Sequence, residues 1–184
     1  SPLGVYGRTK SEGEDWVAKE MTQYYIIRTS WLYGFDGHNF VYTMTNAMNT
    51  RDSVKVVNDQ KGCPTFCGDL ASAALRFIDK ADNATSFFGK NSAAPYGIYH
   101  FTDEGETTWY DFTKAIYTYG KKTGRITRDC DIQPCTSAEF ASKAARPAYS
   151  ALSKAKIEKE LRIKIPSWQS SLERFMKNDR FLIH

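Results

Sequence analysis

Tyr6 and Lys10 are the two side chains whose types and spacing most directly suggest chemistry. In a helix, positions four apart lie on one face, one turn from each other. A free tyrosine has a pKa of about 10, whereas a good acid–base catalyst titrates near the working pH. An ammonium about 4 Å away stabilises a phenolate by roughly 4 kcal/mol at an effective dielectric near 20. The pair therefore suits proton donation to an oxygen being reduced, although a tyrosine packed on a lysine stem has the same spacing.

Trp31 and Asn39 are the next residues that could face a ligand. Trp31 follows the stretch 24–29, whose aromatic and β-branched residues predict a buried strand. Ligands bind at the carboxyl ends of strands in open α/β sheets, so Trp31 either faces a substrate or belongs to the core. Asn39 is a good N-cap for a helix over 40–50, and this role does not exclude a hydrogen bond to a ligand.

The four cysteines do not suggest a metal site. Cys63, Cys67, Cys130 and Cys135 form C-x3-C and C-x4-C pairs without a nearby histidine, and this spacing does not match a zinc ribbon or finger. We expect free thiols, as in a reducing cytoplasm, and no bound metal among these groups.

The elements that would position these residues alternate between helix and strand. Helices are expected over 4–21, 40–50, 69–80, 109–119, 154–161 and 166–177. Strands are expected over 24–29, 54–57, 97–101 and 128–133, with polar loops over 58–65 and 81–95. We expect Gly120 to end the fourth helix and Ser153 to cap the fifth. This alternation predicts an α/β fold.

Length and composition narrow the class of protein. The chain has 184 residues, of which 41% are hydrophobic and 25% charged, as in a globular domain with its own core. The net charge of +4 is spread along the chain, which does not indicate nucleic-acid binding. No apolar run approaches about 18 residues and no signal peptide is visible, so we expect a cytoplasmic protein without a membrane partner.

The first residues resemble a known catalytic helix. Pro2, the block 6–10, Gly13 and Glu14 resemble the catalytic helix of extended short-chain dehydrogenases/reductases that act on nucleotide sugars. Six further blocks are similar to the dTDP-4-dehydrorhamnose reductase family, occur in that family's order and span nearly the whole chain. These blocks are 28–34, 39–40, 59–65, 97–100, 108–112 and 146–150.

The resemblance implies both a fold and a reaction. It implies the C-terminal part of a Rossmann-like fold: the last strands of the nucleotide-binding sheet and a smaller mixed α/β substrate-binding lobe. The family reduces the C4 ketone of dTDP-4-dehydro-L-rhamnose to give dTDP-L-rhamnose, with NADPH or NADH as cofactor. By motif position, Tyr6 resembles the proton donor to the C4 oxygen. Lys10 resembles the residue that lowers the pKa of this tyrosine and holds the nicotinamide ribose.

The same resemblance implies substrate-binding residues. Trp31 resembles a wall of the sugar pocket. Asn39, Gln60 and Arg146 are candidates for contacts with the nucleotide and the diphosphate. An arginine suits a diphosphate because its donors pair with two oxygens at once. An ion pair at the edge of the domain is the alternative role for Arg146.

One feature of the family is absent. No Gly-x-x-Gly-x-x-Gly or Gly-x-Gly-x-x-Gly pattern occurs, so the turn that holds a dinucleotide pyrophosphate is missing. We therefore expect the C-terminal part of a longer enzyme, which would not hold NADPH firmly by itself. Residues 1–38 would end the nucleotide-binding domain and carry the catalytic helix. Residues 39–184 would form mainly the substrate-binding lobe, with some segments returning to the sheet.

Other partners and functions stay open. Some family members use magnesium at a subunit contact, and no carboxylate in this sequence is assigned to that role. A homodimer of the full-length protein is a further option, with a dTDP-sugar as the small-molecule partner. Two other functions fit the same fold: a non-catalytic, nucleotide-binding regulatory subunit, and an epimerase or dehydratase acting on another nucleotide sugar.

Overall fold

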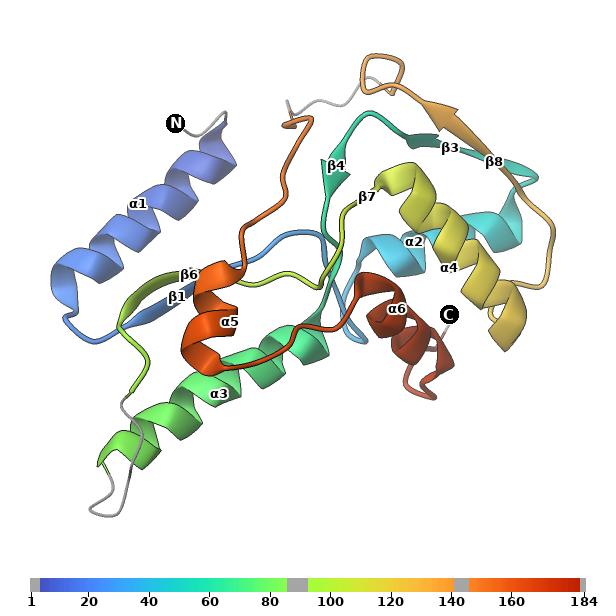
Figure 1. The fold of residues 1–184 in the computed structure, drawn as a ribbon. Coiled ribbons are helices and arrows are strands. Elements are labelled where there is room, and N and C mark those ends of the chain that lie inside the picture. Colours follow the sequence, from blue (N-terminus) through green and yellow to red (C-terminus); the bar gives the residue numbers. More distant parts are fainter. Residues whose placement is uncertain (1–3, 86–92, 141–145, 183–184) are drawn as a thin grey trace.

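The structure is a computed structural model that describes residues 4–85, 93–140 and 146–182. Pro2 and part of the expected loop 81–95 lie outside the described residues. Within them, helices and strands alternate along the chain (Figure 1), which confirms the predicted α/β class.

The helices are α1 (Val5–Glu20), α2 (Phe40–Thr50), α3 (Cys67–Thr85), α4 (Trp109–Thr123), α5 (Ala155–Leu161) and α6 (Trp168–Lys177). Three of the described helices, α2, α4 and α6, combine buried apolar residues with a capping side chain. Asn39, Thr108 and Ser167 cap α2, α4 and α6, because a side-chain oxygen of each accepts a backbone N–H of the first turn. The predicted cap at Asn39 is confirmed.

The strands are short and pair two by two. They are β1 (Tyr25–Arg28), β2 (Leu32–Tyr33), β3 (Ser53–Val57), β4 (Lys61–Gly62), β5 (Thr65–Phe66), β6 (Gly97–His100), β7 (Thr107–Thr108) and β8 (Asp131–Cys135). β1–β6, β2–β5 and β3–β8 are parallel pairs, and β4–β7 is antiparallel. Parallel neighbours require long crossovers, and the helices between them supply these connections.

Two hydrophobic clusters hold the elements together. One is rich in aromatic residues and includes Phe112 of α4 with Leu172 and Phe175 of α6. The other includes Phe77 of α3 and Tyr99 of β6. In Figure 1, α2, α4 and α6 lie with β3 and β8 on one side of the molecule. α1, α3 and α5 surround the β1–β6 pair on the other side.

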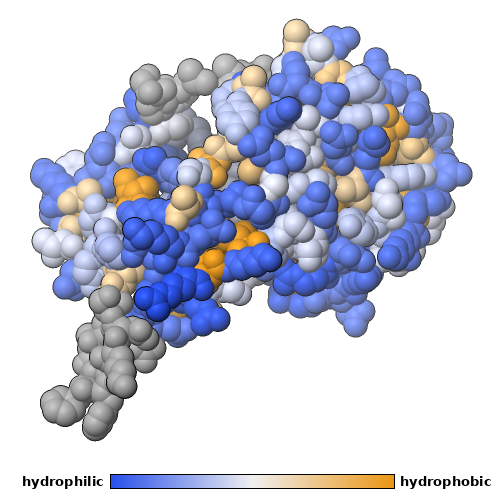
Figure 2. Space-filling view, in the orientation of Figure 1, coloured by the Kyte–Doolittle hydropathy of each residue, from blue (hydrophilic) through white to orange (hydrophobic). Residues whose placement is uncertain are grey.

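The β1 strand is less buried than the sequence predicts. Tyr25, Ile26 and Ile27 are only half-buried, and Arg28 is exposed. Among the described residues, β1 pairs with β6 alone and α1 has no buried residue, so cover on β1 is incomplete. Figure 2 shows hydrophilic residues over most of the face that it draws, with small hydrophobic areas between them.

Two expected loops are partly regular structure. Within 58–65, Lys61 and Gly62 form β4 and Thr65 begins β5, because the backbone of β4 pairs with β7. The α3 helix continues to Thr85, past the expected end at 80. In 61–65 the sequence signals for turns are overridden by strand pairing with distant segments.

Three element boundaries also differ from expectation. α4 runs beyond Gly120 to Thr123 and ends at Gly124, whose φ of 72° is the left-handed conformation that glycine favours. α5 has Lys154 rather than Ser153 at its N-cap position. β8 covers Asp131–Cys135 instead of 128–133. In the described chain, β3 is the one strand that pairs with β8. β8 is therefore an edge strand, and an edge strand can contain a proline such as Pro134.

Candidate active site and nucleotide-sugar pocket

The Tyr6–Lys10 pair lies on one face of α1, as the spacing predicts. The ammonium of Lys10 is 5.7 Å from the centroid of the Tyr6 ring, and Tyr6 is 77% exposed. Two other pairs have the same spacing on α4: Lys114 is 5.2 Å from the ring of Tyr110, and Lys121 is 6.0 Å from Tyr117. The spacing alone therefore does not mark a catalytic pair, and the exposure of the Tyr6 ring is what distinguishes it.

An ion pair fixes α1 against β1. Nε of Arg28 donates to Glu14 at 2.9 Å, and a second guanidinium nitrogen also contacts this carboxylate. The hydrogen bond from Arg28 is the main reason that the pKa of Glu14 lies below its usual range. Because the two side chains are partly exposed, we expect this pair to orient α1 more than to stabilise the fold.

Trp31 occupies a strained backbone position directly before β2. Its φ is +48°, a left-handed conformation that bulky residues rarely adopt. Such positions cost of order 1–3 kcal/mol and cluster at functional sites. The Trp31 carbonyl accepts the N–H of Thr65 at 3.1 Å, and this bond holds the strained residue against β5.

The indole of Trp31 is packed between two neighbours. It stacks on Trp109 with ring centroids 3.5 Å apart and an interplanar angle of 11°. A Cβ atom added to Gly62 would fall 2.6 Å from the Trp31 ring, so only glycine leaves room for this indole. Trp31 thus belongs partly to a packed aromatic group, while its position at the carboxyl end of β1 is the one expected for a ligand-facing residue.

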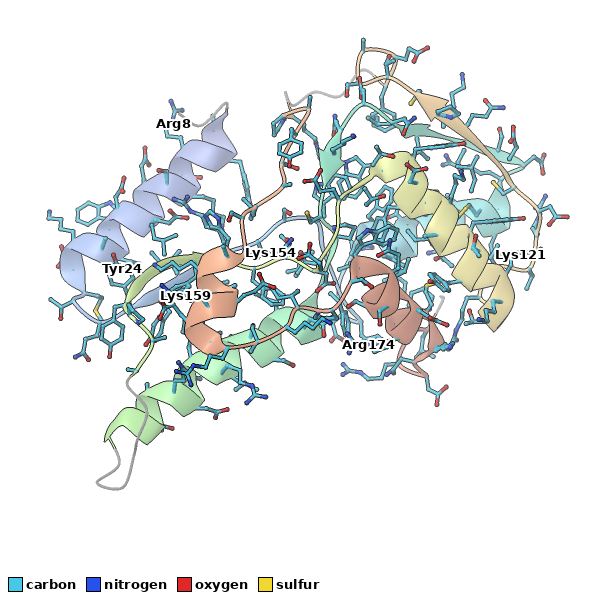
Figure 3. The ribbon with its side chains drawn as sticks, in the orientation of Figure 1. Arg8, Tyr24, Lys121, Lys154, Lys159 and Arg174 are labelled. Atoms are coloured by element: carbon cyan, nitrogen blue, oxygen red, sulfur yellow. The ribbon has the colours of Figure 1, made fainter. Side chains whose placement is uncertain are left out.

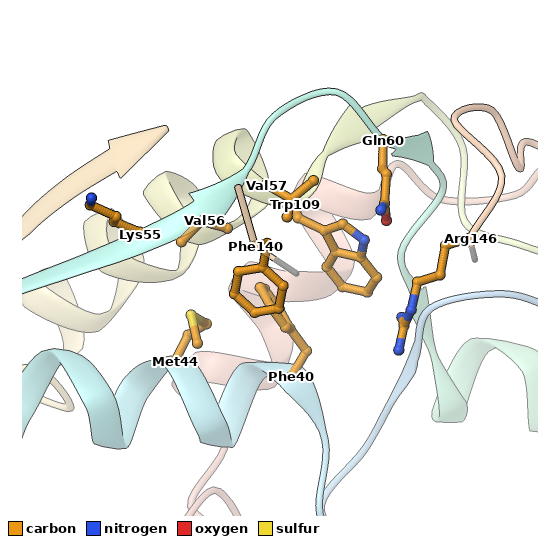
Figure 4. A pocket seen from close by; sticks show the side chains of 9 residues that line it. All are labelled: Phe40, Met44, Lys55, Val56, Val57, Gln60, Trp109, Phe140 and Arg146. Carbon is orange, nitrogen blue, oxygen red and sulfur yellow. The ribbon is translucent and has the colours of Figure 1, made fainter. Parts of the chain in front are cut away.

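A cavity of about 350 Å³ lies next to this stack and combines apolar walls with a few polar groups. It is lined by Phe40, Met44, Lys55, Val56, Val57, Gln60, Trp109, Phe140 and Arg146. In Figure 4, Phe40 and Phe140 lie on one side, Gln60 and Arg146 on the other, and Trp109 between them. Its size and mixed lining are typical of small-molecule sites.

The polar wall of the cavity is held in place by the segment after β8. Gln60 is only 7% exposed, and its Nε2 donates to Oγ of Ser137 at 2.8 Å. Asp59 accepts the backbone N–H of Ser137 at 2.9 Å and its hydroxyl at 2.6 Å. These hydrogen bonds from Ser137 lower the pKa of Asp59. These contacts hold the Gln60 amide at the cavity wall.

The structure groups some of the predicted site residues and separates others. Gln60 and Arg146 line one cavity, and Trp31 is joined to it through Trp109. Among the described residues, the lining includes neither Tyr6 nor Asn39. Both polar atoms of the Asn39 amide hydrogen-bond to backbone, at Val41 and at Gly34. The N-cap role of Asn39 is therefore realised, and its contact with a ligand stays a prediction.

Apart from Gln60 and Arg146, the residues that line this cavity were not predicted from the sequence. Trp109 was placed only as the first residue of a helix, and Phe40 only as the residue after a cap. Lys55 lies on β3, where alternating burial directs its side chain away from the core. The sequence signals for Phe40 and Trp109 are the blocks 39–40 and 108–112, which contain these two residues.

A buried polar group lies between the two hydrophobic clusters. Asp103 is fully buried, and Oδ2 accepts the N–H of Phe66 at 2.9 Å. The pKa of Asp103 is raised to about 7, mainly by burial and also by the nearby carboxylate of Asp69, although the Phe66 N–H and Arg174 oppose the change. Arg174 extends from α6 (Figure 3) and pairs with Asp69 of α3 at 2.6 Å.

All four cysteines are free thiols, and in the described part of the chain no three His, Cys, Asp or Glu side chains converge as a metal site requires. No helix in the described residues has both the length and the apolar character needed to cross a bilayer.

Comparison with known proteins identifies close relatives. A dTDP-4-dehydrorhamnose reductase from Sinorhizobium fredii is 38% identical over 176 residues, which are 95% of this chain and 56% of that protein. A crystal structure of dTDP-4-dehydrorhamnose reductase from Bacillus anthracis in complex with NADP superposes with a TM-score of 0.81 at 35% identity. It aligns with 95% of this chain and 56% of its own. The ortholog from Clostridium acetobutylicum gives a TM-score of 0.82 at 39% identity, over 96% of this chain and 56% of its own.

These relatives confirm the predicted fold and the resemblance. The chain spans just over half the length of the relatives that it matches, 56% in each of the three cases. The family model described as the RmlD substrate binding domain matches residues 1–181. Because this match runs over almost the whole chain, the protein belongs to the RmlD substrate binding domain family.

Proposed function

We propose that the whole protein carrying this chain reduces the C4 ketone of dTDP-4-dehydro-L-rhamnose to dTDP-L-rhamnose with NADPH or NADH. The main support is the exposed Tyr6–Lys10 pair on α1 in a chain 38% identical to a dTDP-4-dehydrorhamnose reductase. Reduction of a ketone requires a hydride at carbon and a proton at oxygen. Tyr6 and Lys10 of this chain are suited to supplying the proton at the oxygen.

In this proposal the chain's own residues manage the proton and the orientation of the sugar. A nicotinamide cofactor, when bound, supplies the hydride. The Tyr6 hydroxyl donates its proton to the C4 oxygen as the ketone becomes an alcohol. The Lys10 ammonium, one turn along α1, stabilises the phenolate left behind and hydrogen-bonds to the nicotinamide ribose. Trp31 would form one wall of the sugar pocket.

The face of α1 fits a cofactor that approaches it closely. A Cβ atom added to Gly13, on the same helix, would meet nothing within 4 Å, and Tyr6 is exposed. Tyr6 and Lys10 would hold the nicotinamide end of the cofactor on this open face. For magnesium, no convergent set of carboxylates exists in the described residues, so we assign no residue to that ion.

The cavity beside Trp109 suits the nucleotide of the substrate. Its aromatic side chains can stack on a base, and the Gln60 amide can hydrogen-bond to it. Lys55 and Arg146 add positive charge for the diphosphate. Asn39 would act indirectly, because capping α2 keeps Phe40 at the cavity wall.

The arrangement into two parts supports the proposed domain division. Within residues 1–38, β1 packs with α3, β6 and α5 in the second hydrophobic cluster, whereas Tyr33 of β2 and Phe35 pack in the first. We assign the group around β1 to the nucleotide-binding domain and the cluster around α2, α4 and α6 to the substrate-binding lobe. A cytoplasmic location agrees with four free thiols. We also propose a homodimer of the whole protein and assign no residue of this chain to its interface.

Replacing Tyr6 by phenylalanine tests this function. The whole protein should consume NADPH when given dTDP-4-dehydro-L-rhamnose. Tyr6→Phe should lower kcat by about 10²- to 10⁴-fold, because only the proton donor is removed. Tyr117→Phe is a matched control, since it removes the hydroxyl from the same Tyr-x-x-x-Lys spacing on α4 and should leave kcat unchanged.

Two results would contradict the proposal separately. Unchanged NADPH absorbance with the wild-type protein would reject the reaction. Near-normal turnover by Tyr6→Phe would reject the role of Tyr6 while leaving the reaction in place.

A further inference from the structure

We propose that Trp109 is a positioning residue: it fixes the orientation of the Trp31 indole and so couples the nucleotide cavity to the placement of the sugar. This inference rests on the proposed function. It concerns a residue that no motif of the sequence marked for a role in binding or catalysis.

The first observation is the stack itself. The two indoles lie 3.5 Å apart and almost parallel, at 11°. Phe40 packs against Trp109 with ring centroids 4.4 Å apart. Trp109 is the first residue of α4, and the Thr108 cap fixes the start of that helix. Trp109 is therefore held by its own helix and by Phe40, and it can serve as a fixed surface for Trp31.

The second observation is that Trp31 needs such a surface. Its φ of +48° is unfavourable for a tryptophan, so the backbone by itself does not favour this conformation. The Thr65 N–H holds the carbonyl of Trp31, and Gly62 leaves space for the ring. These contacts fix the main chain and permit the ring position. The stack on Trp109 is the contact that sets the plane of the ring.

The third observation is that Trp109 also lines the nucleotide cavity, together with Gln60 and Arg146. One indole thus contacts both the predicted sugar-facing residue and the proposed base site. A base that enters the cavity packs beside Trp109 and restricts the side-chain movement that α4 and Phe40 still allow. This restriction is passed to Trp31 through the stack, before the sugar is reduced.

The test compares Trp109→Leu and Trp109→Phe in the whole protein. Trp109→Leu removes the aromatic surface and should lower kcat at least about tenfold, because small displacements of a bound substrate cost large factors in rate. Its affinity for dTDP alone, measured by calorimetry, should fall by a smaller factor. Trp109→Phe keeps a ring against Trp31 and should recover most of kcat. Trp16→Phe, at an exposed tryptophan of α1, is the control and should change neither quantity.

A spectroscopic readout makes the inference independent of turnover. Two stacked indoles give a coupled signal in near-ultraviolet circular dichroism. Adding dTDP should change this signal in the wild type and in Trp16→Phe, and should leave no such change in Trp109→Phe or Trp109→Leu. A wild-type signal that does not respond to bound dTDP would overturn the inference, even if the protein proves inactive as a reductase. Equal kcat in Trp109→Leu and the wild type would overturn it in an active protein.

Discussion

Asp103 is a carboxyl group in a buried site that stabilises a negative charge poorly. Its side chain is fully buried, and Oδ1 has no hydrogen-bond partner in the described chain. Burial raises its pKa to about 7. The folded protein therefore holds the proton over a pH range in which the unfolded chain has lost it. Stability from this group is fully present below the ordinary pKa of an aspartate, and it is lost as pH rises through about 7.

Asp103→Asn tests this pH dependence. The amide oxygen can still accept from Phe66, and the amide nitrogen carries no charge. The variant should be more stable than the wild type at pH about 8. Its stability should also vary less between pH about 5 and 8, since each unit of pKa shift corresponds to about 1.4 kcal/mol. Thermal unfolding at several pH values measures both effects.

The control for this experiment is an exposed aspartate. The pKa of Asp129 is lowered by its contact with Lys121, so Asp129 stays ionised throughout this pH range. Asp129→Asn should leave the pH dependence unchanged. A wild-type slope that persists in Asp103→Asn would show that the pH effect comes from another group.

Single residues differ in how far the sequence reveals their role. Asn39 was predictable as a cap because its partners, Val41 and Tyr42, are its immediate neighbours. Trp109 and Asp103 were not, because their roles depend on Trp31 and Phe66, which are distant in the chain. The sequence shows the Tyr6–Lys10 spacing, but two pairs on α4 have the same spacing, so spacing alone does not identify a catalytic pair. Local patterns predict local contacts, and the residues around the cavity are brought together only by the fold.

At the scale of elements, α4 shows how one glycine can be required by packing. Gly120 lies inside the helix, where glycine is unfavourable by about 1 kcal/mol relative to alanine. A Cβ atom there would lie 2.5 Å from Cδ1 of Ile126, a fully buried residue. The segment after α4 therefore packs directly on the helix backbone, which explains why the sequence signal for a helix end at Gly120 was wrong.

Gly120→Ala and Gly13→Ala form a matched pair of substitutions inside helices. Gly120→Ala should lower the free energy of unfolding by about 1–3 kcal/mol, because Ile126 must move. Gly13→Ala meets no atom within 4 Å in the described chain and should not lower it. Urea unfolding of both variants measures the difference. Equal stability of the two variants would mean that Ile126 adapts without cost.

Long periodic helices were predictable, and two-residue strands were not. The apolar faces of α2, α3 and α6 repeat at helical spacing, and their predicted centres are confirmed. β4 and β7 have two residues each, which is too short for an alternation of apolar and polar residues that would predict a strand. They exist because their backbones meet in the folded chain. The pairing of strands depends on distant partners, which single-sequence patterns do not contain.

At the scale of the whole molecule, a polar bridge joins the two hydrophobic clusters. α3 packs in one cluster through Ala73 and Phe77, and α6 in the other through Phe175. Asp69 of α3 accepts from Arg174 at 2.6 Å and from the Ser171 hydroxyl at 2.6 Å, both on α6. The Asp69 side chain is only 11% exposed, so water screens this carboxylate less than it screens a fully exposed one.

Removing Arg174 should therefore cost more than breaking an exposed pair. Arg174→Gln should lower the free energy of unfolding by about 1–2 kcal/mol, because a mostly buried carboxylate loses its cation. Lys121→Gln breaks the exposed pair with Asp129 and should change it by less than about 0.5 kcal/mol. Denaturant unfolding compares the two. Similar values for both variants would show that the bridge does not hold the clusters together.

The short antiparallel pair β4–β7 has a consequence for how this chain can vary in length. Gly62 pairs with Thr107, and Lys61 pairs with Thr108, directly before Trp109. Gly62 also makes room for Trp31, so two indoles from distant parts of the chain are aligned through one ladder of four residues. One residue inserted between 57 and 62, or between 104 and 108, would displace this alignment. Insertions after Gly37 or Gly124 would leave the alignment of the two indoles intact. The β4–β7 ladder therefore limits the length of the segments 57–62 and 104–108.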